Sequence, residues 1–217
     1  MEENNNPVEE VLNSAANIDV NAEFKATEGF FKEFIKSPVD AVMQEAKNSK
    51  VSMVMFGVLM LLWMLVSALP AFVNQIRTVW RLRNAFVSPS IFTIVTVPAR
   101  AALAPVIGVV IISLVIFAIN NTGKKSIGDI IKLVAITQIP SIVASVIFIA
   151  NILGTWTFRF LFPVGSLGVG LSILLLFTAI KTLNNEESNS QAFFSFAKVY
   201  GIYMIARIFF SLIGVSI

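Results

Sequence analysis

The sequence predicts an all-α fold, a polytopic helical membrane bundle with five transmembrane helices preceded by an amphipathic N-terminal helical segment. Three observations predict it. Of the 217 residues, 56% are hydrophobic and 13% are charged, whereas soluble domains have about 45–50% and about 25%. The mean hydropathy is +0.81. Apolar runs long enough to cross a hydrocarbon core of about 30 Å also recur along the chain. A soluble fold of this length could not bury so much apolar surface, so we expect much of it to face lipid.

The first fifty residues differ from the rest of the chain. Residues 1–23 are rich in Asn and Glu and are predicted to form an acidic, disordered tail. Residues 24–50 have apolar side chains at helical spacing, opposite charged ones, and Ser37-Pro38 is typical of a helix start. Two interpretations are equally supported. These amphipathic interfacial helices either lie on the membrane surface or cover one end of the bundle.

Residues 51–217 form the predicted transmembrane domain. Its spans are expected at about residues 51–76, 101–119, 133–153, 160–180 and 192–217. Pro98 and Arg100 interrupt the apolar stretch that begins at Ile91, so we expect residues 91–97 to lie at the interface or to be re-entrant. Gln138 and Pro140 predict a break in the third span, where freed backbone groups line a cavity or bond to a neighbour.

Small residues in the fourth span predict close helix packing. Gly168 and Ser172 are four residues apart, as are Ser166 and Gly170. Such pairs allow two helix backbones to approach each other in a membrane. The glycines at 165, 168 and 170 follow no predicted strand, so they do not indicate a nucleotide-binding loop.

Basic residues segregate by type. Five crossings would place all ten lysines on the N-terminal side and all six arginines on the other: Arg77, Arg81, Arg83, Arg100, Arg159 and Arg207. Seven lysines flank the spans on the N-terminal side against five arginines opposite, which favours a cytoplasmic N-terminus. The arginines either form a surface that binds lipid phosphates or an acidic partner, or serve as ordinary interfacial anchors beside tryptophan.

Arg207 lies within the last span, where an isolated arginine costs about 2.5–3.5 kcal/mol. No Asp or Glu lies inside any predicted span, so its partners are expected to be carbonyls, amides such as Gln138, water or lipid phosphate. The candidate polar intramembrane site comprises Gln138, Pro140, Tyr203 and Arg207. Arg207 either contacts an anion or a headgroup inside the bundle, or extends to the interface and braces carbonyls.

The residue inventory argues against catalysis. The chain has no His and no Cys, which excludes imidazole bases, thiol nucleophiles and His/Cys metal sites. The predicted spans also lack the paired carboxylates that intramembrane aspartyl chemistry and proton relays use. We therefore expect a protein that is not an enzyme, with no catalytic residue, no metal, no cofactor and no nucleic-acid partner.

The chain resembles the bacterial members of the Yip family, five-span membrane proteins named for interaction with Ypt/Rab GTPases. The resemblance lies in the span DIIKLVAITQIPSIVASVIFIANIL, with a proline near its middle, and in the approach segment FFKEFIKSPVDAV. It implies an integral membrane adaptor that organises membrane and binds lipids, a membrane-protein partner or a second copy of itself. The DLYGP-like signature of eukaryotic members is absent.

Two other functions remain open from the sequence. One is a small-solute or lipid transporter or channel, in which Gln138, Pro140 and Arg207 face a shared polar path. The other is an accessory subunit of a larger membrane complex. We expect location in the bacterial cytoplasmic membrane, and the opening MEENNNPVEE lacks the basic start and apolar core of a cleaved leader.

Overall fold

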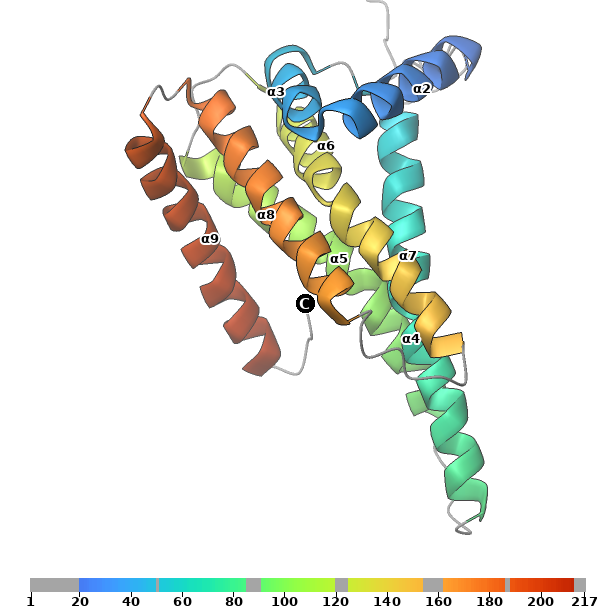
Figure 1. Cartoon of the computed structure of the whole chain (residues 1–217). Coiled ribbons are helices and arrows are strands. Elements are labelled where there is room, and N and C mark those ends of the chain that lie inside the picture. Colours follow the sequence, from blue (N-terminus) through green and yellow to red (C-terminus); the bar gives the residue numbers. More distant parts are fainter. Residues whose placement is uncertain are drawn as a thin grey trace, which may run out of the picture.

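The computed structural model describes residues 20–49, 51–84, 91–119, 125–153, 162–185 and 188–212. Within these ranges it contains eight helices and no strand, which confirms the all-α prediction. The helices are α2 (Val20–Lys36), α3 (Pro38–Asn48), α4 (Met53–Asn84), α5 (Ile91–Ile119), α6 (Ile127–Thr137), α7 (Ile139–Leu153), α8 (Phe162–Leu183) and α9 (Asn189–Leu212). In Figure 1, α4 to α9 form a bundle and α2 and α3 lie across one of its ends.

Four helices in the described residues are long and apolar enough to cross a membrane. They include Met53–Arg81 in α4, Phe92–Ile119 in α5, Pro163–Leu183 in α8 and Asn189–Ser211 in α9. A fifth span results if α6 and α7, bent by 43°, are counted as one. Large apolar side chains cover the outer faces of the bundle, such as Leu61 on α4 and Ile205 on α9, which are 61% and 69% exposed. A surface of this kind is suited to lipid and not to water, so the chain is an integral membrane protein.

The second apolar stretch forms one long helix. Helix α5 begins at Ile91 and continues through Pro98 and Arg100 to Ile119, so residues 91–97 join the predicted crossing at 101–119. A proline costs about 3 kcal/mol in a helix interior in water. In a membrane the alternative is a break that leaves several unpaired backbone groups in hydrocarbon, which costs more. The helix therefore continues, and the interruption expected at Pro98 does not occur.

Helices α2 and α3 are packed against the bundle. Helix α3 contacts α6 and α8, and its side chains Val42 and Ala46 are buried. Ser37 is the N-cap of α3 and Pro38 is its first residue, as predicted, although the Ser37 hydroxyl bonds to the Asp40 carboxylate instead of a backbone N–H. The packing supports the interpretation in which the helix pair covers the end of the bundle.

Two lysines attach this helix pair to the start of α6. The Lys125 ammonium donates to the carbonyl of Lys47 at 3.0 Å and to the hydroxyl of Ser49. The Lys132 ammonium donates to the carbonyl of Val51 at 3.3 Å. Lysines commonly satisfy the last carbonyls of a helix, as Lys125 does for α3. These bonds place the starts of α4 and α6 at the same end of the bundle.

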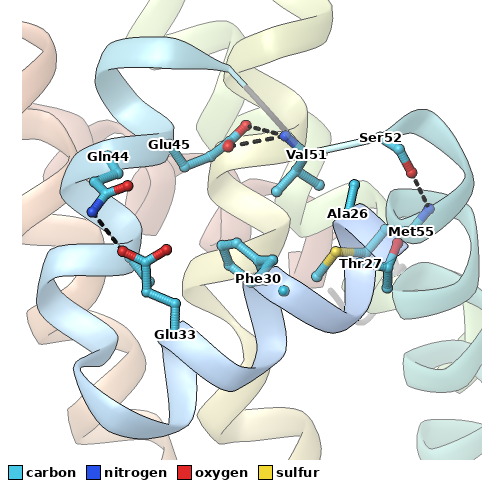
Figure 2. Close-up of a pocket in the computed structure, with 11 residues that line it drawn as sticks. Ala26, Thr27, Phe30, Glu33, Gln44, Glu45, Val51, Ser52 and Met55 are labelled. Carbon is cyan, nitrogen blue, oxygen red and sulfur yellow. Dashed lines mark hydrogen bonds between the residues drawn. The ribbon is translucent and has the colours of Figure 1, made fainter. Parts of the chain in front are cut away.

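A buried carboxylate fixes the turn between α3 and α4. Glu45 is only 4% exposed, and both of its carboxylate oxygens accept the backbone N–H of Val51, at 3.1 and 3.0 Å. The Ser52 hydroxyl accepts the N–H of Met55 at 3.0 Å. Figure 2 shows both contacts beside a cavity of about 230 Å³ between α2, α3 and the start of α4. Glu45 is therefore a structural residue whose charge caps a backbone donor.

We expect Glu45→Gln to destabilise the folded protein by about 1–3 kcal/mol, because the neutral amide loses the charge that strengthens the bond from the Val51 N–H and brings an NH₂ donor toward it in place of one oxygen. The measurement is the midpoint temperature at which detergent-purified protein loses its monodisperse size-exclusion peak. Glu28→Gln is the matched control, since Glu28 is exposed and its surface ion pair with Lys32, at 2.6 Å, is screened by water and adds little to stability. Equal midpoints for the two variants would contradict the capping role.

Helices α7 and α8 approach each other closely at Gly168. A Cβ atom there would lie 2.4 Å from the Cβ of Ala144 and 2.8 Å from the carbonyl oxygen of Pro140. Beside this contact, the backbone N–H of Ser141 donates to the Ser172 hydroxyl at 3.2 Å. The predicted packing through Gly168 and Ser172 and the predicted break at Gln138 are both confirmed. The packing predicted for Ser166 and Gly170 is not, because both residues are exposed and a Cβ at Gly170 would meet no atom within 4 Å. The donor freed by the break is bonded by the neighbouring helix.

Candidate functional site

A polar cavity of about 350 Å³ lies inside the bundle. Its walls come from α4, α5, α7, α8 and α9, together with the junction between α6 and α7. Its polar lining residues are Gln138, Ser141, Ser145, Ser172, Tyr200, Tyr203 and Arg207. Trp63, Pro105 and other apolar side chains complete the wall. The bend between α6 and α7 thus exposes polar groups to a space that a straight helix pair would have filled.

Arg207 is the one charged residue among the described residues that line this cavity. It forms no hydrogen bond or salt bridge with any other described residue, and its side chain is exposed. It lies within α9, the last helix of the described residues, as the sequence predicted. Arg207 nevertheless lines the cavity, so it belongs to the side of α9 that borders this space.

Two tyrosines share the Arg207 face of α9. Tyr200, Tyr203 and Arg207 follow one another at spacings of three and four residues, which places them on one stripe of a helix. The Tyr200 and Tyr203 ring centroids are 6.0 Å apart. The Tyr203 hydroxyl lies over Gly108 of α5, 3.5 Å from where a Cβ would stand. The Tyr203 phenol therefore packs against α5 at the cavity wall.

The opposite wall has hydroxyls and an amide from α7, α8 and the junction. The Ser141 and Ser172 hydroxyls are 2.8 Å apart, and the Ser145 hydroxyl donates to the carbonyl of Ser141 at 2.8 Å. The Gln138 amide donates one hydrogen to the Thr137 hydroxyl at 3.2 Å. Ser141 and Ser172 therefore link α7 to α8, and Ser145 bonds within α7, whereas Gln138 keeps a second N–H for a ligand.

Three of the four predicted site residues line the same cavity: Gln138, Tyr203 and Arg207. Pro140 does not line it, and its carbonyl instead faces Gly168 of α8. Pro140 is the second residue of α7 and lies just after the bend that contains Gln138. The serine cluster of α7 and α8 was not predicted as part of the site. The sequence does show that Ser141 and Ser145 follow the predicted break one helical turn apart, but nothing in it indicates that Ser172 of the next span faces them.

The remaining arginines lie elsewhere. Arg77, Arg81 and Arg83 belong to the last turns of α4, which project beyond the other helices in Figure 1. Arg77 and Arg81 are exposed there, and Trp80 between them is 72% exposed. Arg100 is an exposed residue of α5, and Arg159 lies outside the described residues. Of the described arginines, Arg207 alone lines the cavity.

Comparison with family models, curated proteins and solved structures finds no match for this chain. The Yip resemblance stays a prediction. No group of three or more acidic, His or Cys side chains that could hold a metal ion occurs in the part of the chain that the structure describes. The kind of ligand that the cavity could bind is therefore argued from the hydrogen-bond donors that line it.

Proposed function

We propose that this protein is a non-enzymatic integral membrane protein that binds an anionic phosphate group in its intramembrane cavity. The observation behind the proposal is the position of Arg207 on a cavity whose described lining residues include no acid. The ligand therefore supplies the negative charge that the protein does not. The proposal keeps the lipid-binding part of the predicted adaptor role.

The energetics of an intramembrane arginine support an anionic ligand. Arginine at the centre of a membrane helix costs about 2.5–3.5 kcal/mol, and a partner that bonds its forked donors offsets this cost. Phosphate oxygens match the guanidinium geometry and accept two parallel hydrogen bonds. The hydroxyl of Tyr203 and the second amide N–H of Gln138 are further donors on the same cavity.

The size of the cavity suits a headgroup. Its volume of about 350 Å³ lies near the lower end of the roughly 300–1,000 Å³ typical of small-molecule sites. A phosphate with a small polar substituent fits this space, whereas a whole phospholipid does not. The shared chemistry is thus a phosphomonoester or phosphodiester group, whether free or attached to a lipid.

We expect Arg207→Gln to weaken binding of glycerol phosphate at least tenfold. The binding constant is measured by isothermal titration of detergent-purified protein. Arg207→Lys should retain part of the affinity, because ammonium keeps the charge but lacks the forked donor geometry. Arg100→Gln is the control, since Arg100 is an exposed arginine of α5 that does not line the cavity. Equal weakening by the glutamine variants would contradict a specific role for Arg207.

For the projecting end of α4 we propose an anchoring role. Exposed Trp80 between Arg77 and Arg81 supports it, because tryptophan and arginine are favoured at the membrane–water interface. We further propose that the protein lies in the bacterial cytoplasmic membrane with its N-terminus in the cytoplasm. The end with α2 and α3 would then face the cytoplasm and the end of α4 the opposite side.

A further inference from the structure

A second cavity, on the outer side of α7 and α8, adjoins the phosphate cavity. This groove has a volume of about 630 Å³ and is lined mainly by apolar and small residues, among them Ala144, Phe148 and Gly170. Four of its lining residues, Ser141, Ser145, Val169 and Ile173, also line the phosphate cavity. The two spaces therefore share part of their wall, at residues of α7 and α8.

Two glycines of α8 leave the groove unfilled. A Cβ atom at Gly165 or Gly170 would have no neighbouring atom within 4 Å, in contrast to the crowded position of Gly168 on the same helix. Around the groove, Val169 and Leu174 are 52% and 60% exposed. This face of α8 is therefore accessible from the surrounding hydrocarbon.

The groove continues along the outer face of α8. A third space, lined by residues from Pro163 to Leu174, shares Ser166, Gly170 and Ile173 with the groove. Twelve helical residues extend about 16 Å. This length is close to one leaflet of a hydrocarbon core of about 30 Å. An acyl chain is the membrane component with these dimensions and this polarity.

We propose that the ligand is a phosphate-bearing membrane lipid, with its headgroup in the cavity and an acyl chain in the groove between α7 and α8. The inference rests on the proposed phosphate site and names the class of molecule that occupies it. The shared wall puts a polar and an apolar space next to each other, which supports one ligand with a polar and an apolar part. The lipid reaches the cavity sideways from the bilayer, and a water-soluble phosphate would use only the cavity.

The test fills the groove and leaves the cavity intact. Gly170→Leu and Gly165→Leu place an isobutyl group in the groove, and neither glycine lines the phosphate cavity. Gly57→Leu is the matched control, because Gly57 is an exposed glycine of α4 with no atom within 4 Å of its Cβ position. The detergent-purified chain is titrated with phosphatidic acid, glycerol phosphate and diacylglycerol, and binding is followed by native mass spectrometry.

We expect each groove variant to weaken phosphatidic acid binding at least tenfold, with glycerol phosphate binding unchanged. Gly57→Leu should change neither, and diacylglycerol should bind at least tenfold more weakly than phosphatidic acid. Unchanged phosphatidic acid binding in both groove variants would overturn the lipid inference and leave the phosphate site standing. Loss of both phosphate ligands in both variants would also overturn it, because the effect would then not separate chain from headgroup. If the unaltered protein does not bind glycerol phosphate, that result would instead contradict the proposed function.

Discussion

Gly168→Ala should destabilise the bundle by more than about 2 kcal/mol, since overpacking a tight contact typically costs about 1–3 kcal/mol. The added methyl would lie 2.4 Å from the Cβ of Ala144 and 2.8 Å from the carbonyl oxygen of Pro140. The second of these atoms is backbone and cannot rotate away. Relief requires α7 and α8 to separate, which also stretches the bonds between Ser141 and Ser172.

Gly170→Ala is the control on the same helix. Its Cβ meets no atom within 4 Å, so the change should be neutral or gain up to about 1 kcal/mol of helix propensity. The measurement is again the midpoint temperature for loss of the monodisperse peak in mild detergent. The two alanine variants should shift this midpoint in opposite directions or by clearly different amounts. Equal shifts would show that α7 and α8 are not in tight contact at Gly168.

The fold followed from the sequence because lipid imposes simple requirements. Apolar runs of sufficient length located α4, α8 and α9, and the Ser37-Pro38 pair located the start of α3. The ends of the long helices were less predictable. Helix α4 continues to Asn84, well beyond the apolar run, because Arg77 and Arg81 disfavour hydrocarbon but favour a helix. Composition therefore indicates where lipid contact ends, and not where the backbone leaves the helix.

The site was only partly predictable. Gln138, Tyr203 and Arg207 stood out because they are polar residues in apolar segments, and they line one cavity. Which helices lie side by side is a tertiary property, so the sequence could not indicate the contact between Ser141 and Ser172. The groove was hidden for the same reason. Open and crowded glycines in α8 have the same sequence pattern and differ only in the neighbour they face.

Single cysteines at residues 78 and 188 should label from opposite sides of the membrane. Thr78 is exposed in the last turns of α4, whereas Ser188 precedes α9, whose start lies at the bundle end covered by α3 in Figure 1. In the orientation that we propose from the lysine excess on the N-terminal side, that end faces the cytoplasm. A membrane-impermeant maleimide should therefore label Thr78→Cys in intact bacterial cells and Ser188→Cys only after the membrane is opened.

The unaltered chain contains no cysteine, so it provides an unlabelled control without further mutation. The expected difference is nearly all-or-none, because an impermeant reagent reaches one face of an intact membrane. Labelling of both positions in intact cells would contradict the separation of the two ends by the bilayer. The reversed pattern would keep that separation but invert the orientation, because arginines would then outweigh the lysine excess in directing insertion. The expected pattern and the reversed pattern would each show whether the lysine-bonded end near α3 or the projecting arginine end of α4 faces the cytoplasm.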